Sequence, residues 1–179
     1  MKYHNITKAD MLNGEGLRVV LWVSGCSHHC PGCQNAITWD QTEGLEFDNT
    51  AKEEIFAELE KDWCSGLTLS GGDPLFYGNR CDISSLVVEV KEKFPNKTIW
   101  LYTGYTWEEL LEQVTSDNNL DTILKHIDVL LDGRFVLKLA SLKIHYVGSS
   151  NQKIIDVPKS LANQEKILYI DNSEVLESE

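Results

Sequence analysis

Hydrophobic and polar positions follow two alternating patterns along this chain. Short apolar runs rich in β-branched and aromatic residues, which are typical of strands, cover 18–25, 66–72, 97–105 and 128–135. Helical patterns lie between them: 50–63, a segment after Asp82, 106–114 and about 120–127. Thr50 with Glu53 and Thr106 with Glu109 have the spacing of capping boxes at the starts of two of these helices.

Four alternations of strand and helix favour an α/β fold with a mostly parallel sheet built from βαβ units. We expect a further strand over 142–152. From about Pro158 the chain is more acidic and less periodic, which fits a short appended element or a partly disordered end. The sequence therefore predicts one main domain over 1–157 and a C-terminal extension over 158–179.

The length and net charge of the chain argue against several classes of protein. A chain of 179 residues fits one domain and buries a substantial core. Its net charge of -12 argues against a nucleic-acid surface and against docking on an anionic membrane. No apolar run has the length of a membrane span, and the start of the chain lacks the apolar segment of a signal peptide. These features predict a cytoplasmic protein without a nucleic-acid or membrane partner.

Three of the five cysteines lie in the eight residues CSHHCPGC, directly after the first predicted strand. The simplest interpretation is that the three cysteines are small buried hydrophobic residues. However, Pro31 and Gly32 between Cys30 and Cys33 indicate a turn rather than a segment that faces the core. A zinc site would need a fourth ligand, such as a neighbouring histidine. An iron–sulfur cluster bound by Cys26, Cys30 and Cys33 would keep one iron open, and an open metal position is typical of a catalytic site.

The spacing C-x3-C-x2-C after a first strand resembles the signature of the radical S-adenosylmethionine (SAM) enzymes. The resemblance implies a [4Fe–4S] cluster whose open iron binds SAM and cleaves it reductively. The segment SGGDP, with Gly71, Gly72 and Asp73, looks like the motif that holds the methionine end of SAM, although a plain tight turn has the same composition. The carboxyl ends of parallel strands meet at one edge of a sheet, so the cysteine loop, SGGDP, TGY and DGRF should face one crevice.

Further motifs narrow the resemblance to the activating enzymes of the anaerobic (class III) ribonucleotide reductases. These motifs are NGEG, VSGC, CPGCQN, LSGGDPL, TGY, LLDGRF and GSSNQ, in that order over about residues 1–153. The resemblance implies that the chain generates a glycyl radical on the large reductase subunit. It also implies a low-potential electron donor such as flavodoxin, a homodimer as one oligomeric state, and a trimmed partial (β/α) barrel of radical SAM type.

Carried over residue by residue, the resemblance assigns roles to ten positions. The cluster ligands would be Cys26, Cys30 and Cys33, and the residues contacting SAM would be Gly32, Cys33, Gln34, Gly71, Gly72, Asp73, Asp132 and Arg134. For Asp132, a simple turn is the alternative. The polar residues 149–152 would line the cofactor site, dock the partner or form a hydrogen-bonded turn. Gly32 stands where many radical SAM enzymes have an aromatic residue, so the side chains that stack on adenine stay open.

Other hypotheses compete with this one. The chain would alternatively activate a different glycyl-radical enzyme, modify a small molecule by radical SAM chemistry, or act as a zinc or electron-carrier module without catalysis. An electron carrier normally completes its cluster with a fourth cysteine, and Cys64 and Cys81 are isolated in sequence. We interpret these two as passive thiols, and His28 and His29 as solvated loop residues.

Overall fold

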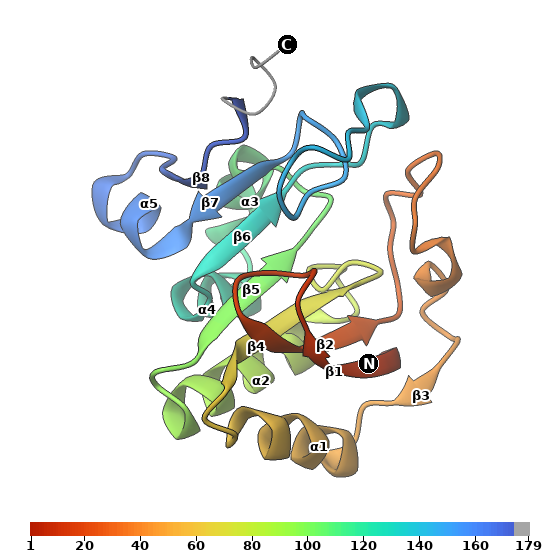
Figure 1. Ribbon diagram of the computed structural model, residues 1–179, viewed down its shortest axis with the longest axis vertical. Helices are drawn as coiled ribbons and strands as arrows, with labels where there is room; N and C mark the ends of the chain where they lie inside the picture. The colour runs from red at the N-terminus through yellow and green to blue at the C-terminus, as the bar shows by residue number, and fades with distance from the viewer. Residues whose placement is uncertain (174–179) are drawn as a thin grey trace.

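The computed structural model describes residues 1–173, and its fold is built on one mixed β-sheet (Figure 1). The strands are β1 (Lys2–Asp10), β2 (Leu17–Val23), β3 (Leu45–Glu46), β4 (Cys64–Gly71), β5 (Thr98–Tyr102), β6 (Val129–Asp132), β7 (Lys153–Asp156) and β8 (Leu168–Ile170). The helices are α1 (Asn49–Leu59), α2 (Arg80–Lys93), α3 (Trp107–Val114), α4 (Asn118–His126) and α5 (Val157–Asn163), with 3-10 turns η1 (Ala36–Thr38) and η2 (Leu137–Leu139). The strand order is β3-β1-β2-β4-β5-β6-β7-β8.

The centre of the sheet is parallel and its two sides are antiparallel. β2, β4, β5 and β6 pair in parallel, whereas β1 and β3 on one side and β7 and β8 on the other pair antiparallel. The α/β class is confirmed, but the expectation of a mostly parallel sheet was wrong. β1 and β2 are joined by the short segment 11–16, which suits an antiparallel pair, whereas β6 and β7 pair antiparallel although the longer segment 133–152 connects them.

The helices that connect the parallel strands lie on one face of the sheet (Figure 1). The strand order from β2 to β6 advances in one direction, and right-handed crossovers then place every connecting helix on the same side. Strand residues alternate accordingly between two cores. Ile99 and Leu101 pack in the core beneath the helices, while Trp100 and Tyr102 belong to a second cluster on the open face.

Two helix starts illustrate local sequence control. At α3 the predicted capping box is confirmed: the Thr106 side chain accepts from the Glu109 N–H, and Glu109 accepts from the Thr106 N–H. At α1 the predicted box of Thr50 and Glu53 was wrong, because Asp48 is the N-cap and accepts from the Ala51 N–H. Aspartate is as good a cap as threonine, so the helix begins earlier than expected.

Two further segments differ from expectation. β1 was not predicted, because only Tyr3 and Ile6 of its nine residues are buried and the hydrophobic alternation is weak. The strand expected over 142–152 was wrong: this segment consists mainly of bends and turns, and β7 follows it. Beyond this segment, β8 pairs with β7, and α5 connects the two strands. Residues 174–179 lie outside the described residues. No helix among residues 1–173 is long and apolar enough to cross a membrane.

Candidate functional site

The cysteine loop connects β2 to η1 at the carboxyl end of the parallel strands. Cys26, Cys30 and Cys33 are free thiols, all partly exposed. A tight turn closes the loop, in which the Cys33 N–H donates to the Cys30 carbonyl at 3.0 Å. The Asn35 N–H donates to the Cys33 sulfur at 3.4 Å, and burial raises the pKa of the Cys26 thiol. The backbone N–H groups of His28 and His29 partly offset that rise in pKa.

This donor set fits an iron–sulfur cluster better than a single metal ion. Within residues 1–173 no three His, Cys, Asp or Glu side chains converge on one point in the way a single ion requires. A [4Fe–4S] cluster instead binds each thiolate at a different iron, so its ligands stand further apart. Three free thiols on one partly exposed loop, with the Asn35 N–H donating to the Cys33 sulfur, are the chemistry that such a cluster uses.

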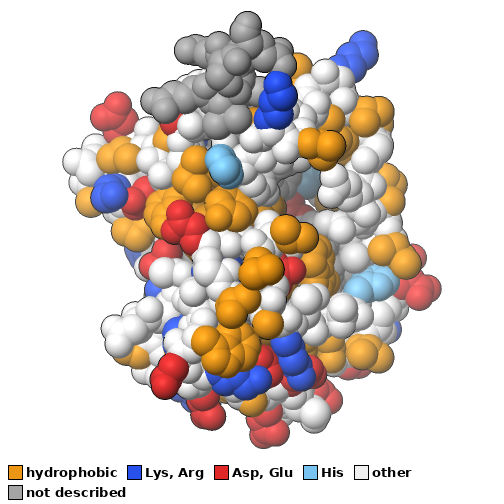
Figure 2. Space-filling model, in the orientation of Figure 1, with side chains coloured by type: hydrophobic (Ala, Val, Ile, Leu, Met, Phe, Trp, Pro, Cys, Tyr) orange, Lys and Arg blue, Asp and Glu red, His pale blue; other side chains and the backbone are white. Residues whose placement is uncertain are grey.

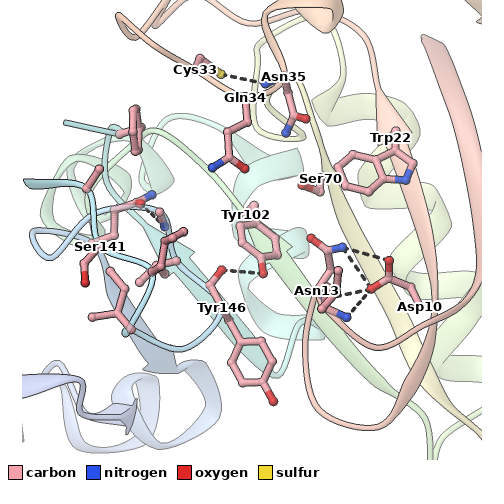
Figure 3. Close-up of a pocket in the computed structure, with 18 residues that line it drawn as sticks. Asp10, Asn13, Trp22, Cys33, Gln34, Asn35, Ser70, Tyr102, Ser141 and Tyr146 are labelled. Carbon is pink, nitrogen blue, oxygen red and sulfur yellow. Dashed lines mark hydrogen bonds between the residues drawn. The ribbon is translucent and has the colours of Figure 1, made fainter. Parts of the chain in front are cut away.

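A cavity of about 680 Å³ lies on the open face of the sheet beside this loop (Figure 3). Cys33 and Gln34 border one end, and Asn13 and Asp10 border the other. The segment between β6 and β7 closes one side through Phe135 and residues 140–148. Figure 2 shows hydrophobic side chains gathered in the middle of this same face. The volume is in the range of small-molecule sites.

Three neighbouring parallel strands form the floor of the cavity with one residue each. Trp22 of β2 pairs in register with Ser70 of β4, and Tyr102 of β5 follows the pair Leu69 and Leu101. All three side chains point to the face opposite the helices and line the cavity. The Tyr102 hydroxyl donates to the Tyr146 carbonyl at 2.9 Å, and burial raises its pKa. Sequence reasoning missed this row, although the strict alternation within the predicted strands carried the signal.

The glycines of SGGDP let backbone segments approach one another closely. Gly71 has a φ of +104°, and a Cβ there would meet the Val23 backbone at 2.7 Å. A Cβ at Gly72 would meet the Gly25 carbonyl oxygen at 2.5 Å and the Thr38 carbonyl oxygen at 2.9 Å. The Gly72 N–H donates to the Val23 carbonyl at 2.8 Å. Both glycines thus hold the end of β4 against the base of the cysteine loop.

Asp73 and His28 form a buried pair beneath the cysteine loop. The His28 Nε2 lies 2.8 Å from the Asp73 Oδ2, and their side chains are only 5% and 1% exposed. The expectation that His28 is a solvated loop residue was therefore wrong. His29, in contrast, is exposed and stacks on Trp39 at a ring distance of 4.8 Å. Chain neighbours at 28 and 29 thus face opposite environments.

The remaining candidate residues, Gly32, Asp132 and Arg134, make separate contacts and do not form one cluster. Gly32 has a φ of +78° and lies under the Leu137 side chain. Asp132, the last residue of β6, is buried and accepts at 2.8 Å from the N–H of Trp107, the first residue of α3. Burial raises the pKa of Asp132. Arg134 is exposed and pairs with Glu109 at 3.0 Å. Asp132 and Arg134 do not line the cavity, and neither do Gly32, Gly71, Gly72 and Asp73.

The polar residues 149–152 hold the segment between β6 and β7 in place. The Gln152 Oε1 accepts from the Gly148 and Ser149 N–H groups, and its Nε2 donates to the Gly133 carbonyl at 2.9 Å. Asn151 donates to the Arg134 carbonyl at 2.9 Å. The hydrogen-bonded turn is thus present, and Gln152 borders the cavity as well.

Comparison with known proteins places the chain in a family. A family model described as a 4Fe-4S single cluster domain matches residues 12–155, a range that includes the cysteine loop and most of the cavity. A protein of Enterobacteria phage T4, named anaerobic ribonucleoside-triphosphate reductase-activating protein, is 42% identical over 154 residues, which cover 86% of this chain and 93% of the relative. The chain belongs to this family of activating proteins.

Two bacterial members of the family show the same extent of similarity. The relatives of the same name from Vibrio cholerae and Escherichia coli K12 are 40% and 38% identical over 156 residues, covering 86% of this chain and 97% of each relative. The family assignment confirms the resemblance drawn from the motifs around Cys26, Gly72 and Asp132. It also explains the cluster-type donor set, since the matching domain is one of a single 4Fe-4S cluster.

Proposed function

We propose that this chain activates an anaerobic ribonucleoside-triphosphate reductase by generating a glycyl radical on it. The observation that carries the proposal is the position of the cysteine loop at the end of the open-face cavity, in a chain of the activating-protein family. Cys26, Cys30 and Cys33 would hold the cluster, and the cavity would hold SAM. A [4Fe–4S] cluster would supply the electron that cleaves SAM to methionine and a 5′-deoxyadenosyl radical, which would take a hydrogen from a glycine of the reductase.

The chain's own groups divide the binding of SAM between them. Gly71 and Gly72, which hold the end of β4 against the base of the cysteine loop, would present backbone carbonyls to the methionine ammonium. Gly32 and Gln34, on either side of Cys33, would lie along the methionine end. The aromatic floor, Trp22 and Tyr102, offers flat surfaces for adenine where Gly32 offers none.

The open face suits a substrate that is part of another protein. The helices cover the opposite face, while the sheet and the segment between β6 and β7 border the cavity, so this face would be the open side of a partial barrel. A loop of the reductase would enter there. A low-potential donor such as flavodoxin would supply electrons in a reducing cytoplasm. A homodimer would be compatible with both the entry of the reductase loop and the supply of electrons.

The test is anaerobic reconstitution with iron and sulfide, followed by electron paramagnetic resonance before and after SAM. We expect about four irons per chain, a reduced-cluster signal that SAM changes, and release of 5′-deoxyadenosine. Addition of the reductase should then give a glycyl-radical signal. Cys30→Ala should lose nearly all bound iron, while Cys81→Ala, which removes an exposed thiol on α2, should retain it.

Two results would contradict the proposal. Stoichiometric zinc without iron would return the loop to a structural role. A SAM-responsive cluster that forms no radical on the reductase, yet modifies another glycyl-radical enzyme or a small molecule, would assign the chemistry to a different substrate.

A further inference from the structure

The His28–Asp73 pair lies where three of the motif segments meet. His28 is in the cysteine loop, Asp73 follows β4, and Thr103 and Gly104 follow β5. The pair is separated by 45 residues in the chain, yet both side chains are almost fully buried. A buried polar contact of this kind fixes one arrangement of the segments that it joins.

The Asp73 carboxylate is fully used inside the protein. The Oδ1 atom accepts from the Leu75 N–H at 2.8 Å, and the Oδ2 atom accepts from the Gly104 N–H at 3.0 Å. The Thr103 hydroxyl lies 3.0 Å from both oxygens. With His28 as the fourth group, the lone pairs of the carboxylate are occupied. No acceptor site and almost no exposed surface are left for a ligand ammonium.

The surroundings of His28 are shaped to its imidazole ring. A carboxylate only accepts hydrogen bonds, so the Nε2 atom carries the hydrogen in this contact. The Tyr105 ring meets the imidazole edge-on at a centroid distance of 4.5 Å. A Cβ at position 104 would collide with the imidazole, so the glycine of TGY is what allows the ring to reach Asp73. His28 follows Cys26 by two residues in the chain, so a contact that fixes the imidazole also restrains the start of the cysteine loop.

We propose that His28 is a positioning residue that fixes the cluster-binding loop onto Asp73, and that Asp73 acts through His28 rather than by touching SAM. This deepens and rests on the proposed function, because the loop is the one assigned to the cluster. The contact restrains the backbone of the loop between Cys26 and Cys30. The methionine ammonium is then left to the backbone carbonyls of Gly71 and Gly72.

Hydrogen–deuterium exchange on the iron-free protein tests the contact without any catalysis. His28→Phe keeps a ring against Tyr105 but removes the hydrogen bond to Asp73, and should speed exchange in 26–35 roughly tenfold or more. His29→Phe is the matched control, since it preserves the stack on Trp39 and should exchange as the unmodified protein does. His28→Gln, whose amide can still donate to Asp73, should restore most of the protection. Equal exchange in the two phenylalanine variants would overturn the proposal.

A measurement on the unmodified protein covers the case in which His28→Phe folds poorly. The Nε2 hydrogen of His28 should be visible by nuclear magnetic resonance as a slowly exchanging signal, and a hydrogen in rapid exchange with water would overturn the contact. In the reconstituted protein, His28→Phe should change the SAM-dependent paramagnetic signal, whereas His29→Phe should not. Because the exchange measurements need neither cluster nor reductase, their failure is distinct from failure of the proposed activity.

Discussion

Single atoms decide how closely the cysteine loop approaches the sheet, and Gly72 is the sharpest case. Gly72→Ala would place a methyl group 2.5 Å from the Gly25 carbonyl oxygen, a backbone atom that cannot move alone. We expect the change to displace the loop, to lower the unfolding free energy by roughly 1–3 kcal/mol and to weaken SAM binding. Urea denaturation and a SAM titration of the reconstituted protein would measure both effects.

Gly78→Ala provides the control for that substitution. The nearest atoms to a Cβ at Gly78 belong to the side chains of Phe76 and Gln41, which can shift. Stability and SAM affinity close to those of the unmodified protein are expected. If both alanine variants behave alike, close backbone packing at Gly72 is not what holds the loop.

Arg18 is a second residue whose role is set by burial. The residue is 1% exposed, and its guanidinium lies over the Trp100 ring and donates to hydroxyl and carbonyl oxygens, among them Thr68 Oγ1 at 2.7 Å. Burial lowers the pKa of Arg18 to about 10. Arg18→Met would leave several buried oxygens without a donor, so the unfolding free energy should fall by roughly 3 kcal/mol.

Arg134→Met tests whether charge alone explains that loss. Arg134 is exposed and pairs with Glu109 at the surface, where ion pairs contribute little. Urea denaturation should show only a small change for this variant. A loss as large as that of Arg18→Met would mean that net charge, rather than buried hydrogen bonding, dominates.

The candidate site was only partly predictable at this scale. The cysteines and glycines stand in short motifs whose spacing is visible in the chain. The burial of His28 depends on Asp73 and Gly104, which are distant in sequence and meet only because β2, β4 and β5 are neighbours. Nothing local distinguishes His28 from His29, so the difference between them could not be read before the fold was known.

At the scale of elements, the parallel core was predictable and the sheet margins were not. The runs of β2, β5 and β6 are largely apolar, and β4 alternates Leu67 and Leu69 with small polar residues, so each run has a strand pattern that is visible in the sequence. β1 is largely polar because one side of it is solvated, and its strand conformation depends on its pairing with β2 and β3. The segment 142–152 has the apolar residues of a strand, but Ile144 and Val147 pack down on the open face instead of pairing.

The capping box of α3 allows a direct test of an element-level prediction. Thr106→Ala removes the acceptor for the Glu109 N–H, and the loss of such a cap costs about 1 kcal/mol. Urea denaturation should show that loss. Thr115→Ala, at the exposed C-terminal end of the same helix, should change stability by a few tenths of a kcal/mol at most. Equal effects at the two ends would contradict the role of the cap.

Over the whole molecule, the excess of acidic groups makes the few buried cations important. Arg80 joins three helices: it is on α2, lies 2.8 Å from Asp117 at the start of α4 and donates to Gln113 on α3 at 2.8 Å. Burial alone would raise the pKa of Asp117, but the hydrogen bond and charge of Arg80 and the N–H donors of α4 outweigh it and hold that pKa below its ordinary value. This ion pair is mostly buried.

The lowered pKa of Asp117 predicts a specific dependence of stability on pH. A carboxyl group whose pKa is depressed by folding contributes stability above its unfolded pKa, about 3.9, and loses it as the pH falls through the folded value. Asp117→Asn keeps a good helix cap but removes the charge beside Arg80. The variant should therefore be less stable at pH 7, and its unfolding free energy should fall less steeply as the pH drops below about 4.

Urea denaturation between about pH 2 and pH 7 would measure the unfolding free energy at pH 7 and its decrease toward low pH. Asp121→Asn is the matched control variant. Asp121 pairs with Lys125 on the exposed side of α4, so its replacement removes the same charge without leaving a buried cation unpaired. If the loss in Asp117→Asn reflects the buried pair, Asp121→Asn should follow the unmodified protein across the whole range. If the two variants follow one curve, the acid sensitivity of the fold comes from overall charge, and Arg80 is not the point at which the helices depend on pH.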